Sequence, residues 1–172
     1  MGKNEREVLH MSELKELAQQ VGEQLLQQHR LLAVAESCTG GWVAKCLTDI
    51  AGSSQWFDRG FVSYSNAAKQ AMLGVSGDTL ETAGAVSEQT VREMAAGVLE
   101  NSLATVALAI SGIAGPGGAM PGKPVGTVCF AWTVAGDEVQ AETRHFEGDR
   151  DSVRRQSVGF ALQGLLNVLG RG

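Results

Sequence analysis

Cysteine and histidine are scarce in this sequence, since each occurs three times in 172 residues. The cysteines show no C-x-x-C spacing, and no histidine lies near them in the pattern that a zinc site requires. We therefore expect neither a metal ion nor another cofactor. Cysteines without such a pattern are typical of a protein from a reducing compartment, so we predict a cytoplasmic location.

Positive charge and long apolar runs are also lacking. Fourteen lysines and arginines stand against nineteen acidic residues, and the formal net charge of −5 disfavours nonspecific binding of nucleic acid. Residues 1–11 are polar rather than an apolar signal core, and no apolar run approaches the ~18 residues of a membrane span. We expect a protein that is not exported and that has neither nucleic acid nor a membrane as a partner.

At 172 residues the chain is long enough for one domain with a sizeable core. Its hydrophobic content of 44% is sufficient to form that core. We predict a flexible N-terminus over residues 1–11 and a single domain over residues 12–172. Apolar runs predict strands at 31–35, 60–64, 105–110, 125–134 and 139–146, the last two forming an antiparallel hairpin. Helical patterns predict helices over 42–47 and after caps at Ser12, Ser65 or Asn66, Ser87, and Asp149 or Asp151. This order indicates a three-layer α/β/α sandwich with a mixed sheet.

The segment Ala35-Glu36-Ser37-Cys38-Thr39-Gly40-Gly41 places a hydroxyl where a predicted strand feeds a predicted helix. Gly40 and Gly41 open that helix, and free backbone N–H groups at a helix N-terminus favour a phosphate, a carboxylate or a developing oxyanion. The segment therefore predicts an anion-handling nucleophile site at Ser37. The competing interpretation is that Ser37 only caps the helix. Cys38 is a second candidate nucleophile, but neighbours in an extended segment point to opposite sides, so we expect Cys38 to pack in the interior.

Two further loops follow predicted strands and are expected at the same, carboxyl-terminal edge of the sheet. The first contains Tyr64 and Lys69, which taken alone are most simply a strand-end aromatic and a solvated helix lysine. The second begins with the glycine-rich stretch 111–118, whose backbone can approach a phosphate but which matches no standard phosphate-binding pattern. Arg150 and Arg154, near the start of the last helix, suit a phosphate or carboxylate, or surface salt bridges.

Five motifs occur together and in order: Ala-Glu-Ser-Cys-Thr-Gly-Gly at 35–41, Gly-Ser-Ser at 52–54, Tyr-Ser-Asn-x-x-Lys at 64–69, Gly-Ala-Val-Ser at 84–87 and Ser-Gly-Ile-Ala-Gly-Pro at 111–116. With them the chain, from about Leu14 to the end of the last helix, closely resembles the nicotinamide-nucleotide amidohydrolases, the family of the CinA C-terminal domain. The resemblance implies a deamidase that converts nicotinamide mononucleotide to nicotinic acid mononucleotide and ammonia in pyridine-nucleotide recycling.

The resemblance also implies catalytic roles for Ser37, Tyr64 and Lys69. The set suits an amide substrate, because a desolvated lysine of lowered pKa can act as the base for a serine hydroxyl. Tyr64 would then assist the departure of ammonia. We expect the oxyanion or the substrate to be bound by Thr39, Gly40, Gly41, Ser111, Gly112, Gly115 and Arg150.

Two other classes of function stay open: a nucleotide-binding module that does not hydrolyse its ligand, and an accessory protein associated with competence or DNA damage. A binding module would need the glycine-rich loop and the arginines but neither Ser37 nor Lys69, so the presence of the whole set favours chemistry. We expect a small pyridine mononucleotide as the partner and a homo-oligomer as the assembled state.

Overall fold

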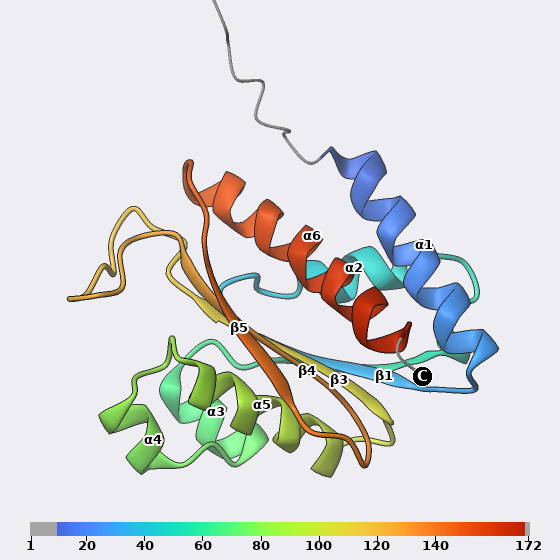
Figure 1. Ribbon diagram of the computed structural model, residues 1–172, viewed down its shortest axis with the longest axis horizontal. Helices are drawn as coiled ribbons and strands as arrows, with labels where there is room; N and C mark the ends of the chain where they lie inside the picture. Colours follow the sequence, from blue (N-terminus) through green and yellow to red (C-terminus); the bar gives the residue numbers. More distant parts are fainter. Residues whose placement is uncertain (1–9, 171–172) are drawn as a thin grey trace, which may run out of the picture.

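The computed structural model describes residues 10–170, in which five strands form one sheet between two layers of helices (Figure 1). The strands are β1 (Leu32–Glu36), β2 (Phe57–Val62), β3 (Val106–Gly112), β4 (Thr127–Val134) and β5 (Gln140–His145). The helices are α1 (Met11–Gln27), α2 (Trp42–Thr48), α3 (Asn66–Leu73), α4 (Gly77–Thr82), α5 (Glu88–Glu100) and α6 (Arg150–Leu169), with a short 3-10 helix, η1 (Ser53–Gln55).

The sheet has the order β2-β1-β3-β4-β5. β1 runs parallel to β2 and β3, whereas β4 is antiparallel to both of its neighbours, β3 and β5. The three parallel strands therefore end at one edge, and the loops that follow them share that edge. The predicted three-layer α/β/α sandwich, with its mixed sheet and C-terminal antiparallel hairpin, is confirmed.

The two faces of the central strands carry side chains of different size. In β1, Leu32 and Val34 belong to the core beneath α1, α2 and α6, while Ala33 and Ala35 belong to the core beneath α3, α4 and α5. All four are fully buried, as expected for a strand that is covered on both faces. The alanines leave room for α5 to lie close to the sheet, and α3, which carries Lys69, packs against α5.

Most predicted elements are present, some with different boundaries. α1 begins at Met11 rather than after Ser12, and the carboxylate of Glu13 accepts the backbone N–H of His10 (2.9 Å). β2 begins at Phe57, three residues before the predicted strand, because this edge strand has no continuous apolar run. The sequence pattern does not predict the short helix α4. Residues 1–9, which make up most of the predicted flexible N-terminus, and residues 171–172 lie outside the described residues.

Residues 10–170 can be searched for membrane-spanning helices, metal-binding groups and disulfides. No helix in that range is long and apolar enough to cross a bilayer. Nor does it contain three His, Cys, Asp or Glu side chains grouped so that they would hold a metal ion. The three cysteines are buried free thiols.

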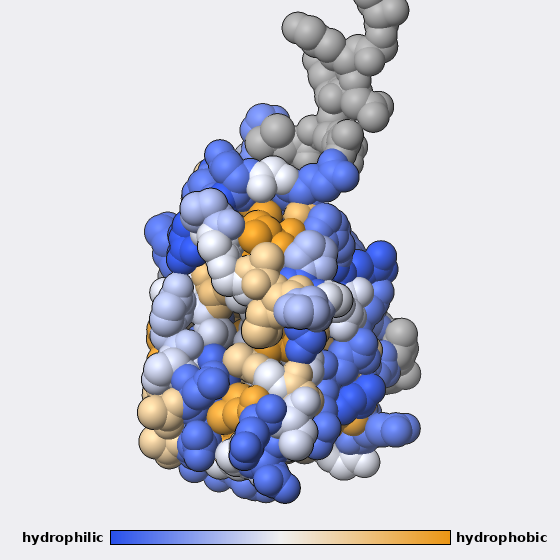
Figure 2. Space-filling model, turned by 90° about the vertical axis from the view of Figure 1, so that its left-hand side faces the viewer, coloured by the Kyte–Doolittle hydropathy of each residue, from blue (hydrophilic) through white to orange (hydrophobic). Residues whose placement is uncertain are grey.

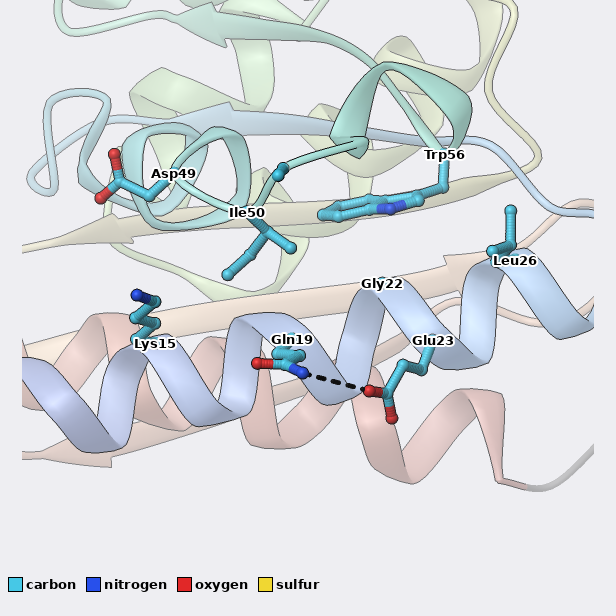
Figure 3. Close-up of a pocket in the computed structure, with 9 residues that line it drawn as sticks. Lys15, Gln19, Gly22, Glu23, Leu26, Asp49, Ile50 and Trp56 are labelled. Carbon is cyan, nitrogen blue, oxygen red and sulfur yellow. Dashed lines mark hydrogen bonds between the residues drawn. The ribbon is translucent and has the colours of Figure 1, made fainter.

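Two helices approach their neighbours through glycine. Figure 3 shows the indole of Trp56 lying over α1 at Gly22, where an added Cβ would come within 2.6 Å of the ring. Gly97 in α5 lies against the backbone of Leu73 at the end of α3, and a Cβ there would overlap the Leu73 carbonyl oxygen. The position of α3, and with it that of Lys69, thus depends on a residue without a side chain in α5.

We expect Gly97→Ala to lower the free energy of unfolding by about 1–3 kcal/mol, the usual cost of overpacking. The sign of the change in the free energy of unfolding is informative, because replacing glycine with alanine in a helix interior without a clash would raise stability by about 1 kcal/mol. Urea denaturation followed by circular dichroism measures the change. Gly77→Ala at the start of α4 is the control, since its Cβ would meet only the flexible Gln70 side chain at 3.4 Å. Equal stability of the wild type and Gly97→Ala would contradict the close packing of α3 on α5.

Candidate active site

A cavity of about 240 Å³ lies where the parallel strands end. Its lining comes from the loops after β1, β2 and β3, from the segment before α5 and from the start of α6. Figure 2 views this end of the molecule, where weakly polar and apolar residues run down the middle between hydrophilic flanks. The residues that line the cavity are 37–38, 64, 66, 69, 85–86, 111–115, 117–118 and 150. The convergence of the three predicted loops is therefore confirmed.

Ser37 lies directly after β1, in the turn that leads to α2. Its backbone N–H donates to the carbonyl of Ile110 in β3 (3.0 Å), and its own carbonyl accepts the N–H of Gly40 (3.0 Å). Gly40 and Gly41 have φ angles of 61° and 102°, which glycine adopts without the penalty that a side chain would bring. The turn holds the Ser37 side chain at the cavity, where it is 7% exposed.

Lys69 lies near the start of α3 and is 1% exposed. Its Nζ is 3.0 Å from Ser37 Oγ, 3.0 Å from the carbonyl oxygen of Ser63 and 3.2 Å from that of Tyr64. None of the carboxylates in the described part of the chain forms an ion pair with it. Burial without a counter-charge lowers the pKa of the Lys69 ammonium. The solvated lysine that the residue alone suggests is therefore wrong.

The contacts of Lys69 suit a base. A neutral amine has two N–H groups and one lone pair, and the carbonyls of Ser63 and Tyr64 offer acceptors for both N–H groups. Lys69 Nζ donates to Ser37 Oγ in the structure (3.0 Å), and after the ammonium loses a proton its lone pair at the same position can take the proton of the hydroxyl. The same hydroxyl lies 3.4 Å from the Tyr64 carbonyl, a longer alternative contact. Geometry and burial thus favour an activated serine.

Cys38 does not compete for this role. Burial raises the pKa of its thiol to about 12, so the thiol stays protonated near neutral pH and is a poor nucleophile. Its side chain is 5% exposed and belongs to the core beneath α6, so the predicted interior packing is confirmed, although the residue also borders the cavity.

Tyr64 and Arg150 meet at the rim of the cavity. The tyrosine is 59% exposed, and its hydroxyl oxygen accepts a hydrogen bond from Arg150 Nη2 (3.0 Å). Arg150 Nη1 also donates to the carbonyl of Gly115 (2.7 Å), so the guanidinium joins α6 to the glycine-rich loop. Tyr64 therefore contributes its backbone carbonyl to the Lys69 environment and its hydroxyl to the cavity entrance.

The glycine-rich loop forms one wall of the cavity, as predicted. Ser111 and Gly112 end β3, and Gly115 follows with a φ of 84°. Gly112 lies so close to β4 that a Cβ would come within 2.7 Å of the Val128 side chain. The loop is joined to the segment before α5 by Lys123, whose Nζ donates to the carbonyl of Ala83 (2.7 Å).

Thr39, Gly40 and Gly41 lie elsewhere, contrary to expectation. They line a separate hollow beside Trp42 and Arg154, not the cavity that Ser37 faces. The N-terminus of α2 also has an occupant, because the carboxylate of Glu36 accepts the N–H groups of Val43 (2.9 Å) and Ala44 (3.0 Å). The anion that the sequence pattern predicts at this helix is therefore a side chain of the protein itself.

The guanidinium of Arg154 also binds groups of the protein itself. Its Nε and Nη2 donate to the carbonyls of Cys38 (3.0 Å) and Thr39 (3.2 Å), so it holds the turn that follows Ser37 from the side of α6. Sequence reasoning misses this contact and the cavity residues Asn66, Ala85 and Val86. Their positions within the Tyr-Ser-Asn and Gly-Ala-Val-Ser motifs are the only signal that points to them.

Comparisons with known proteins show the family of this chain. A family model described as the CinA C-terminal domain matches residues 14–169. The "Nicotinamide-nucleotide amidohydrolase PncC" of Escherichia coli K12 is 56% identical over 154 residues, which cover 90% of this chain and 93% of that protein. The protein of the same name from Pseudomonas putida is 47% identical over 158 residues, covering 92% and 98%.

Solved structures show the same fold. A CinA superfamily protein from Klebsiella pneumoniae superposes with a TM-score of 0.89 at 40% identity, covering 92% of this chain and 99% of that one. The competence/damage inducible protein CihA from Agrobacterium tumefaciens gives a TM-score of 0.87 at 44% identity, covering 90% and 94%. Because the family model spans nearly the whole described chain and the relatives match along most of their own length, this chain belongs to the CinA C-terminal domain family.

Proposed function

We propose that this protein hydrolyses the carboxamide of nicotinamide mononucleotide to nicotinic acid mononucleotide and ammonia. The observation that carries the proposal is the buried amine of Lys69, 3.0 Å from the Ser37 hydroxyl in a cavity. The names of the Escherichia coli and Pseudomonas putida relatives support the substrate. With such a substrate the reaction belongs to pyridine-nucleotide recycling in the cytoplasm, and we propose a homo-oligomer as the working state.

In the first half of the reaction, Ser37 Oγ attacks the carboxamide carbon while its proton passes to Lys69 Nζ. The carbonyl oxygen becomes an oxyanion. Because Cys38 follows the nucleophile and lines the cavity, we assign its backbone N–H as one donor to that oxyanion. The intermediate collapses as the C–N bond breaks, and the nitrogen takes the proton held by Lys69 Nζ and leaves as ammonia, which returns Lys69 to the neutral amine.

Tyr64 is placed to help the amine leave. Its oxygen already accepts a hydrogen bond from Arg150, so its own hydrogen is free to point into the cavity entrance. In the second half, a water molecule gives a proton to the Lys69 amine and attacks the acyl-serine. The C–O bond to Ser37 breaks, Oγ regains a proton, and nicotinic acid mononucleotide leaves as the carboxylate.

Four of the predicted binding residues line the cavity and are assigned to the substrate: Ser111, Gly112, Gly115 and Arg150. The guanidinium of Arg150 is the only arginine side chain among residues 10–170 that lines it, and it suits the phosphate by charge and by its donor geometry. The backbone of the glycine-rich loop can approach the same group.

The test is to incubate the wild-type protein with nicotinamide mononucleotide and to measure ammonia and nicotinic acid mononucleotide. We expect the two products in equal amounts, and a much higher kcat/KM than with nicotinamide riboside, which lacks the phosphate. Binding of the nucleotide without product would show a binding module instead. If the protein neither bound nor hydrolysed the nucleotide, the result would favour the accessory role.

A further inference from the structure

Glu36 is a buried carboxylate next to the nucleophile. It is the last residue of β1 and is 1% exposed. Its two side-chain oxygens accept one backbone N–H each, Oε1 from Val43 at 2.9 Å and Oε2 from Ala44 at 3.0 Å. No lysine, arginine or histidine of the described chain forms an ion pair with it. The first turn of α2 therefore provides the partners of this charge.

These two hydrogen bonds close a loop around the nucleophile. Ser37 begins a connection of five residues between β1 and α2, and Glu36 ties the end of the strand to the start of the helix across it. The connection can then neither lengthen nor shift along the strand without breaking a buried, charge-assisted hydrogen bond. Both ends of the connection that contains Ser37 are therefore fixed.

Glu36 is also linked to the base. Its backbone carbonyl accepts the N–H of Ser63 (2.9 Å), and the carbonyl of Ser63 accepts from Lys69 Nζ (3.0 Å). One residue thus adjoins the serine along the chain and is one hydrogen bond away from the residue that orients the lysine amine. A shift of Glu36 changes the distance between Ser37 Oγ and Lys69 Nζ from both sides.

We propose that Glu36 is a positioning residue for the amide hydrolysis, and that it acts by holding Ser37 Oγ within reach of Lys69 Nζ. The inference rests on the proposed function for its substrate but not for its geometry. Glu36 precedes Ser37 in the chain but is not among the residues that line the cavity. Its loss therefore affects the reacting geometry more than the affinity for the nucleotide.

Two variants probe the hydrogen bonds. Glu36→Gln keeps the length of the side chain but offers one acceptor oxygen, and its NH2 group faces a backbone N–H that it cannot accept. Glu36→Asp keeps the charge but is one methylene shorter, so it cannot reach both N–H groups in the present geometry. Both variants are expected to lower kcat by about 10- to 100-fold, the scale of a misplacement of about 1 Å. KM for nicotinamide mononucleotide should stay within about two-fold.

Asp58→Asn is the matched control. Its carboxylate also accepts a backbone N–H, that of Leu103 (3.0 Å), near the start of β2 and thus at the opposite end of the sheet from the site. The control likewise replaces a carboxylate that accepts a backbone N–H, although this carboxylate is also paired with Arg59 (2.8 Å), and it should leave kcat unchanged. If Glu36→Gln and Glu36→Asp, folded by circular dichroism, also kept wild-type kcat, or lost activity only through KM, the positioning role would be wrong.

A second readout does not need the natural substrate. A small sulfonyl fluoride reacts with an activated serine as Oγ attacks sulfur, the S–F bond breaks, fluoride leaves and the proton passes to the base. We expect mass spectrometry to show labelling of Ser37 in the wild type and a 10- to 100-fold slower rate in the Glu36 variants. Slower labelling would support the positioning role even if nicotinamide mononucleotide were not hydrolysed, whereas equal rates would overturn it.

Discussion

Replacing Ser37 with alanine is expected to lower kcat for ammonia release from nicotinamide mononucleotide by about 10⁴- to 10⁶-fold, the scale seen when a serine nucleophile is removed. The substitution deletes the one hydroxyl that lies 3.0 Å from Lys69 Nζ. No acyl intermediate can then form. Because the cavity lining otherwise stays intact, binding of the nucleotide should remain within a few-fold of the wild-type value.

Steady-state assays of both products and calorimetric titration of the nucleotide separate these two effects. Ser76→Ala is the control, because Ser76 is exposed at the start of α4 and its side chain makes no capping hydrogen bond. It should keep wild-type kcat. Substantial turnover by Ser37→Ala would mean that water or another group attacks the carboxamide directly, and the assignment of a serine nucleophile would fail.

The proximity of Ser37 and Lys69 follows from features that can be recognised in the sequence. Apolar runs mark β1 and β3 as central strands, and parallel strands deliver their following loops to one edge. Of the two predicted caps of α3, Ser65 and Asn66, the structure has Ser65, whose hydroxyl accepts the N–H of Ala68 (3.0 Å). Once these elements are right, a residue four positions after Ser65 faces the same cavity as Ser37.

The occupant of the α2 N-terminus shows what sequence patterns miss. The pattern of a strand, two glycines and a helix predicts free N–H groups at the start of the helix. It does not predict that the Glu36 side chain accepts two of them. Arg154 is a similar case, since it holds carbonyls more than a hundred residues away in the chain. Both contacts depend on side-chain direction in the assembled core, which periodicity does not determine.

Lys69→Met is expected to lower kcat/KM by about 10²- to 10⁴-fold, the range attributed to a general base. Methionine has a similar length and no amine, so it fills the space of a side chain that is 1% exposed. The carbonyls of Ser63 and Tyr64 lose a donor, but the cavity keeps its shape. Lys15→Met on the exposed side of α1 is the control and should be fully active.

The pH dependence of kcat/KM tests whether Lys69 is the base. Burial lowers the pKa of its ammonium, so the neutral amine gains population as pH rises through a midpoint below the ordinary value of about 10.4. Wild-type kcat/KM should rise with pH through that midpoint, and Lys69→Met should lack this rise. Between the lowered and the ordinary pKa the unfolded chain binds more protons than the folded one, so wild-type stability also increases with pH in that window, and this increase should be absent in Lys69→Met. A profile of kcat/KM that is the same in both proteins would assign the proton transfer to another group.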